Sequence, residues 1–97
     1  MIDVKTAVKN AIVFLADLLA EQNVHDVRLE EVELSEDEKV WFITLSYLRR
    51  SAEGEGTVIG KMLASHGLTA RLEREYKIFA VDSATGEVRS MKMRQLA

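Results

Sequence analysis

The first candidate for a chemical role is a glycine-rich segment, residues 49–69, which contains four of the five glycines. A phosphate-binding loop has the pattern G-x-x-x-x-G-K-[ST], in which backbone N–H groups hold the phosphate and the last hydroxyl contacts the metal. Here Gly60 and Lys61 are followed by Met62, and the nearby Glu55 would repel a phosphate. The pattern therefore favours a long mobile connection over a nucleotide site.

The two histidines, His25 and His66, are the obvious candidates for a metal ligand or a catalytic base. They are 41 residues apart in the chain, and a metal site needs further ligands that converge on the same point. Asp26 follows His25 directly, but neighbouring residues of a strand point to opposite faces. The chain has no cysteine, which removes thiolate ligands and disulfides. The sequence therefore indicates no metal site, no catalytic triad and no cofactor.

Charged side chains are frequent without forming a recognisable catalytic or nucleic-acid site. An acidic run contains Glu30, Glu31, Glu33, Glu36, Asp37 and Glu38. It lacks the spacing of a calcium loop and any sign of the burial that shifts a carboxyl pKa, so we interpret it as a solvated strand edge. Basic residues such as Arg74 alternate with acids such as Glu73 and Glu75. This mixture favours cross-strand ion pairs over a nucleic-acid surface.

Length and composition limit the classes of protein that remain. The chain has 97 residues and a formal charge of −3. Its length and its apolar content of 47% are enough for one domain with one packed core. Residues 1–48 carry a formal charge of −6 and residues 49–97 carry +3, so the halves can attract each other within the fold or between copies. The apolar run near the N-terminus is too short for a signal peptide or a membrane span. We therefore expect a cytoplasmic protein with no membrane contact.

Residues 4–22 have the periodicity of an amphipathic helix. Apolar side chains with i, i+3, i+4, i+7 spacing are Val4, Val8, Ala11, Ile12, Leu15, Leu18 and Leu19. Asp3 is suited to cap this helix, because its carboxylate can accept from the free N–H groups of the first turn. Val13 falls on the polar face, and we interpret it as a single exposed valine of the kind found on most proteins.

Two hairpins follow the helix, over residues 24–48 and 70–95. The first alternates with period two, and the consecutive pair Glu30 and Glu31 interrupts the alternation, which predicts a β-bulge. The second is closed by a turn in which Gly86 can adopt a positive φ. The order helix, strand, strand, loop, strand, strand predicts an α+β domain whose N-terminal helix packs on a four-stranded antiparallel meander.

The alternation also predicts which side chains share a face of the sheet. We expect the core under the helix to contain Trp41, Ile43, Leu45, Tyr76 and Ile78. We expect the opposite face to carry an apolar patch made of Phe42, Phe79 and Val81. Exposed apolar surface of this kind marks an interface. Two alternatives remain open: the patch contacts a partner, or the 49–69 segment covers it through Val58, Ile59, Met62 and Leu63.

The second hairpin resembles the end of a PepSY-type module, in which an aromatic or aliphatic strand is followed by D-x-x-T-G-E-V and a final strand. The matching residues are Tyr76, Val81, Asp82, Thr85, Gly86, Glu87 and Val88. The resemblance covers about 20 residues and implies a cystatin-like layout, with a helix laid on an antiparallel sheet. It also implies a regulatory or binding role, often outside the cytoplasm, and supplies no catalytic residues.

Three hypotheses about function follow. The favoured one is a non-catalytic interaction or regulatory module, a homodimer or the partner of another protein, that associates through the apolar sheet face or an edge strand. The alternative is a small-molecule binder or enzyme with a cavity between helix and sheet, where Tyr47 and Tyr76 are the candidate polar groups. Nucleic-acid binding is the least favoured of the three.

Overall fold

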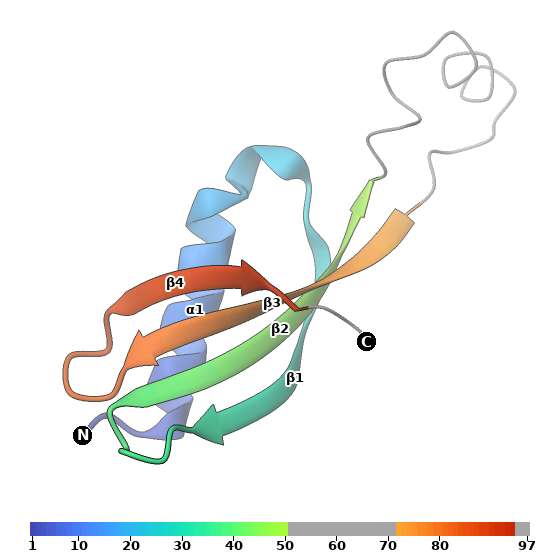
Figure 1. Ribbon diagram of the computed structural model, residues 1–97. Coiled ribbons are helices and arrows are strands. Elements are labelled where there is room, and N and C mark those ends of the chain that lie inside the picture. The colour runs from blue at the N-terminus through green and yellow to red at the C-terminus, as the bar shows by residue number, and fades with distance from the viewer. Residues whose placement is uncertain (51–71, 95–97) are drawn as a thin grey trace, which may run out of the picture.

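One helix lies on one face of a four-stranded sheet in the computed structural model, which describes residues 1–50 and 72–94 (Figure 1). The elements are α1 (Val4–Leu18), the short 3-10 helix η1 (Ala20–Gln22), β1 (His25–Leu34), β2 (Val40–Arg50), β3 (Leu72–Asp82) and β4 (Val88–Met93). Neighbouring strands are antiparallel and follow the order β1-β2-β3-β4. The predicted α+β arrangement is therefore confirmed. Val58 and Ile59 of the glycine-rich segment lie outside the described residues.

Local chemistry defines both ends of α1. The Asp3 carboxylate accepts a hydrogen bond from the Thr6 backbone N–H at 2.8 Å. Hydrogen bonding by the Thr6 side chain, and next by its backbone N–H, holds the pKa of Asp3 below its usual value. The helix ends at Leu18, earlier than the predicted residue 22, and η1 follows it. Asn23 then adopts a left-handed backbone conformation with φ 48°, which turns the chain towards β1.

The pairing register of β2 and β3 corrects the predicted faces of the sheet. Trp41 lies opposite Val81, and Ile43 lies opposite Phe79, and directly opposed residues share one face. Phe79 and Val81 are 0% exposed. The expectation that these two residues form a patch on the uncovered face is therefore wrong, because they belong to the core under α1.

The same register moves Tyr76 and Ile78 out of the predicted core. Ile78 lies opposite Thr44, and Tyr76 lies opposite Ser46, so both lie on the face that α1 does not cover. The segment from Ile78 to Val81 is apolar in both phases of the alternation, so its own pattern does not select a face. The pairing with β2 selects it, because a slip of one residue turns every side chain over.

Small side chains bring α1 close to the sheet. Ala7 and Ala11 are 0% exposed and Leu15 is 1% exposed. Beside them, the ring of Phe14 meets the ring of Phe79 edge-on, with 6.2 Å between the ring centroids. This contact is a main link between the helix and the third strand.

Hydrogen bonds fasten the N-terminal segment to the turns of the sheet. The Ile2 N–H donates to the Ser83 carbonyl at 2.7 Å, and the Trp41 indole N–H donates to the Ile2 carbonyl at 3.2 Å. The Asn10 side-chain amide donates to the Gly86 carbonyl at 2.8 Å. These bonds fix the start of α1 relative to the sheet, and the bond from Asn10 depends on the close approach that a glycine at position 86 permits.

Tyr47 ends the core near the C-terminal end of the helix. Its hydroxyl donates to Glu75 at 2.9 Å, and Glu75 forms an ion pair with Arg49 at 2.9 Å. Burial and the hydrogen bond to Glu75 raise the pKa of Tyr47 to about 12. The neutral phenol is therefore the form that the folded protein prefers.

We expect a loss of stability in alkaline solution that depends on Tyr47. Because the pKa of Tyr47 is raised from 10.0 to about 12 on folding, its contribution is complete below pH 10 and is lost as the pH rises towards 12. Urea unfolding of the wild type and of Tyr47→Phe should therefore give a difference in unfolding free energy that shrinks across this range. A difference that stays constant across it would contradict the assignment.

Candidate functional site

The helix leaves the edge strand β1 largely uncovered. α1 packs on β2, with further contacts to β3 and β4. The first seven residues of β1 are exposed, and Figure 1 shows this strand at the edge of the sheet. Antiparallel edge strands carry unpaired backbone groups along their free side. β1 therefore lies beside the helix with most of its side chains exposed to solvent.

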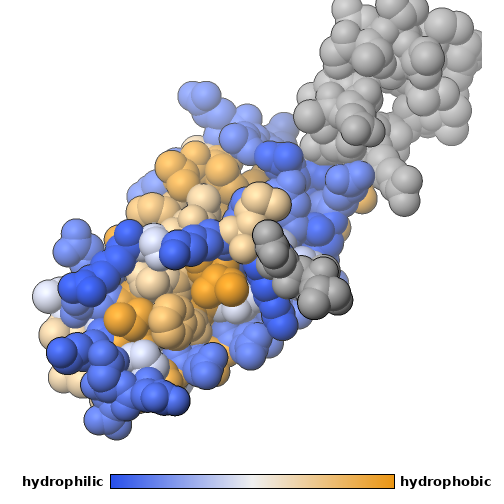
Figure 2. Space-filling view, in the orientation of Figure 1, coloured by the Kyte–Doolittle hydropathy of each residue, from blue (hydrophilic) through white to orange (hydrophobic). Residues whose placement is uncertain are grey.

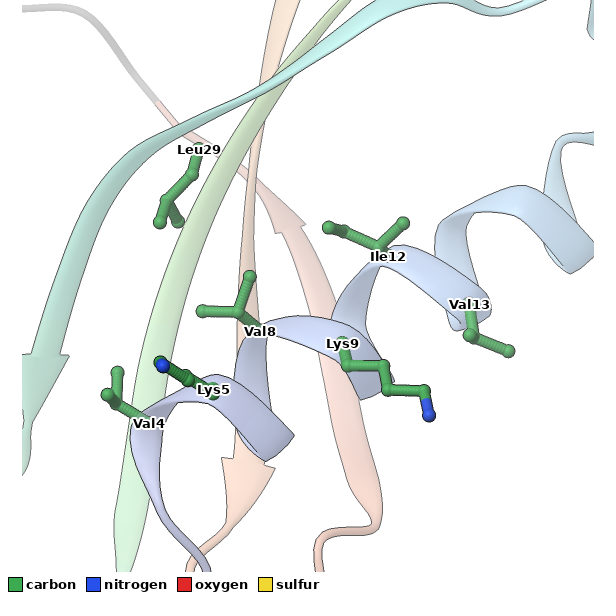
Figure 3. Close-up of a pocket in the computed structure, with 7 residues that line it drawn as sticks. All are labelled: Val4, Lys5, Val8, Lys9, Ile12, Val13 and Leu29. Atoms are coloured by element: carbon green, nitrogen blue, oxygen red, sulfur yellow. The ribbon is translucent and has the colours of Figure 1, made fainter.

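An apolar groove lies between β1 and α1, and we call it the α1–β1 groove. It has a volume of about 410 Å³ and is lined by Val4, Lys5, Val8, Lys9, Ile12, Val13 and Leu29 (Figure 3). Leu29 points from β1 towards the helix, while Val8 and Ile12 extend from α1 on the side that faces the strands. Its apolar side chains remain partly in water: Ile12 is 39% exposed, Val13 is 49% exposed and Leu29 is 50% exposed.

The apolar surface continues past the groove towards the C-terminal end of the helix. A second hollow of about 260 Å³ shares Ile12 with the groove and reaches Ala16, Val24 and Val27. Val27 is 41% exposed. Val13 is therefore not the isolated exposed valine that the sequence suggested, because it belongs to a continuous apolar strip.

Hydrogen bonds and ion pairs hold β1 in place where the helix does not. The extra residue of the predicted bulge is confirmed by a register shift between Leu29 and Glu31. Glu30, at the bulge, accepts a hydrogen bond from the hydroxyl of Ser46 at 2.9 Å, and that hydroxyl accepts from Arg74 at 2.8 Å. Ser46 is 0% exposed and fully partnered. This network links β1 to β2 and β3 and so gives the groove a fixed wall.

The uncovered face of the sheet has a hollow of its own. It has a volume of about 410 Å³ and is lined by Glu31, Glu33, Phe42, Thr44, Ile78, Ala80, Ser90, Lys92 and Met93. Figure 2 looks onto this face and shows apolar residues bordered by hydrophilic ones. Arg94 and Glu31 form an ion pair at 3.4 Å that joins the two edge strands across it. Phe42 lies here as predicted, with Ile78 and Ala80 in place of Phe79 and Val81.

Metal-ligating side chains do not gather in the part of the chain that the structure describes. Over residues 1–50 and 72–94, no three His, Cys, Asp or Glu side chains are placed to hold one ion. His25 borders the second hollow, and His66 lies outside the described residues. Within the same ranges, no helix has the length and apolar character needed to cross a membrane.

Sequence reasoning missed the groove because it assigned every apolar residue of the helical stripe to the core. Val4, Val8 and Ile12 recur every four residues, and this row drifts around the helix, away from the face that meets the sheet. With Val13 beside them, the apolar arc is wider than one sheet face can bury. The width of that arc is the signal that could have predicted a second contact surface.

We expect the exposed side chains of the groove to contribute little to the stability of a single chain. Because the Val13 side chain is half-exposed, we expect Val13→Lys to change the free energy of unfolding by no more than about 0.5 kcal/mol. Urea denaturation of dilute protein measures this, with Leu15→Ala as the matched control, for which we expect a loss of about 2–5 kcal/mol. A large loss for Val13→Lys would assign the residue to the core instead.

Comparisons with known protein families, with curated proteins and with solved structures found no match. The resemblance to PepSY-type modules therefore stays a prediction. The geometry of the two surfaces is what bears on function.

Proposed function

We propose that the chain is a non-catalytic protein-interaction module that binds its partner in the α1–β1 groove. One observation carries the proposal: Val4, Ile12, Val13 and Leu29 remain 37–50% exposed in a single groove, although the core beneath α1 is already closed. Contiguous apolar surface that the fold itself does not need is typical of an interface.

The chemistry of the lining supports binding more than catalysis. Apart from the backbone, the polar groups of the groove are the ammonium groups of Lys5 and Lys9. A catalytic site needs an acid, a base or a nucleophile held against preorganised donors. An apolar groove beside a helix is instead the form that receives the apolar face of another helix.

Protection of the groove in the native cell tests the proposal. The chain has no cysteine, so Val13→Cys gives a unique thiol in the groove, and Glu36→Cys gives a unique thiol in the exposed β1–β2 turn. We expect a cell-permeant maleimide to label the first thiol several-fold more slowly in the cell than in dilute purified protein. Residue 36 should be labelled at the same rate in both.

Equal labelling of both thiols in cell and test tube would mean that the groove is empty and would contradict the proposal. The comparison between the two positions corrects for uptake of the reagent, because both thiols meet the same reagent concentration. Circular dichroism of both variants confirms that the labelled proteins are folded.

A small apolar molecule is the second candidate occupant of the groove. Its volume of about 410 Å³ falls within the range of about 300–1,000 Å³ typical of ligand sites. Such sites also contain a few placed polar groups that orient the ligand, and the α1–β1 groove offers only two lysines. A thermal-shift screen of apolar probes decides this point: stabilisation that Val13→Lys abolishes would favour a small ligand over a protein.

A further inference from the structure

We propose that the partner in the groove is a second copy of this chain, with the two α1 helices packed antiparallel about a two-fold axis at Val13. The inference rests on the proposed interaction function and names the partner and its orientation. It follows from the order of charges along the helix, from the adjacent apolar row and from the apolar strip that runs along α1.

The charged side chains along α1 and η1 are positive near the start and negative near the end. A second copy that runs in the opposite direction would therefore present the opposite charge at each place. Lys5, Lys9, Val13, Asp17 and Glu21 follow one another every four residues, and the four charged side chains are exposed. Lys9 and Asp17 are each four residues from Val13, and Lys5 and Glu21 are each eight residues from it. An antiparallel copy centred on Val13 therefore places each lysine beside a carboxylate, at four contacts in all.

Within a single chain the same arrangement is unfavourable. Like charges at i and i+4 of an α-helix, as in Lys5 with Lys9, repel each other on the helix surface. Lysines near the N-terminus and carboxylates near the C-terminus also oppose the helix dipole. Among the ion pairs of the described residues, none involves these four side chains. An antiparallel helix from a second copy would supply the missing counter-charges.

An apolar row lies next to the charged one and provides the contact. Val8, Ile12, Ala16 and Ala20 are also spaced by four residues, and Ile12 is 39% exposed. At the shallow crossing angle of about +20° found in helix bundles, a row of this spacing on one helix packs between the side chains of the other, and the two helices stay close over several turns. The small side chains of Ala16 and Ala20 allow the two helices to approach closely at the end of the row where the partner's Val8 would lie.

The apolar strip follows the length of α1. It runs from Val4 to Val27 through both hollows. Val27 and Leu29 of β1 would flank the partner's helix.

Charge reversal tests the arrangement by sedimentation equilibrium at low salt, with four proteins: the wild type, Lys5→Glu/Lys9→Glu, Asp17→Lys/Glu21→Lys, and the combination of all four substitutions. We expect the wild type to dimerise. Each double variant should dimerise at least about tenfold more weakly, since it places like charges in contact at both ends. An equimolar mixture of the two double variants should form a heterodimer.

The double variants separate antiparallel from parallel packing, because in a parallel pair each residue meets its own copy and reversal of two charges would leave like charges in contact as before. The combined variant restores every cross-helix pair of the antiparallel dimer, so we expect its dissociation constant to return to within about threefold of the wild type. Both double variants should melt at temperatures no lower than the wild-type monomer, because their new charges suit the helix dipole. Loss of the dimer can then not be ascribed to unfolding.

A wild type that stays monomeric at several hundred micromolar would overturn the self-association. Double variants that dimerise like the wild type would overturn the antiparallel pairing of the charges. A combined variant that fails to dimerise would overturn the antiparallel orientation. None of these results contradicts the proposed interaction function, which the labelling in the cell tests separately: a monomer whose groove is protected there binds a different protein.

Discussion

Replacing Phe79 with alanine is expected to lower the free energy of unfolding by about 3–5 kcal/mol. Phe79 is 0% exposed and lies opposite Ile43 beneath the helix. Its ring contacts Phe14 edge-on, so the substitution removes a link between α1 and β3 and leaves a cavity between them. Urea denaturation of dilute protein measures the change.

The matched control is Phe42→Ala, which removes the same side chain one strand away. Phe42 is 36% exposed on the uncovered face, so we expect a cost of about 1 kcal/mol. Similar costs for the two variants, or a larger one for Phe42, would mean that the faces of the sheet are assigned wrongly.

A second large effect is expected for Gly86→Ala, about 2–3 kcal/mol of lost unfolding free energy. Gly86 has φ 79°, a left-handed conformation that costs a residue with a Cβ about 1–2 kcal/mol. A Cβ there would also lie 2.8 Å from the Asn10 amide nitrogen. That amide would have to move and give up its hydrogen bond to the Gly86 carbonyl, which adds about 1 kcal/mol.

A double-mutant cycle separates the two causes. Asn10→Ala removes the amide that the new methyl group would meet, so Gly86→Ala should cost only the backbone strain, about 1–2 kcal/mol, in that background. The same cost in both backgrounds would show that the contact between Asn10 and Gly86 contributes nothing. Thermal or urea unfolding of the four proteins provides the comparison.

Much of the fold follows from local signals in the sequence. The N-cap at Asp3 and the positive φ of Gly86 each rest on a residue type with a favoured backbone role, and the bulge at Glu30 rests on a break in the alternation of the strand. The structure confirms all three. The alternation of β2 was equally informative, because Ile43, Leu45 and Tyr47 lie under the helix.

Information that depends on pairing between distant segments could not be obtained in this way. Tyr76, Ile78 and Ala80 alternate with Phe79 and Val81, so β3 has apolar residues on both faces. Only its register with β2 places Phe79 in the core. The predicted interface failed at these two residues for that reason, while Phe42 was assigned to the correct face.

The α1–β1 groove was hidden for a different reason. Its lining combines Val13, which lies on the polar face of the helix, with Leu29, which comes from a strand distant from it in the sequence. The groove exists because α1 lies over β2, β3 and β4 and leaves β1 uncovered. The placement of a helix over a sheet is a property of the whole fold, and no local pattern reports it.

Site-specific photo-cross-linking in the native cell tests the central claim most directly. A photoreactive amino acid replaces Val13 in the groove, or Glu36 in the β1–β2 turn as the control. The account predicts a discrete protein adduct at position 13 that is absent at position 36, with twice the mass of the chain if the partner is a second copy. No adduct at position 13, or the same adducts at both positions, would contradict the account.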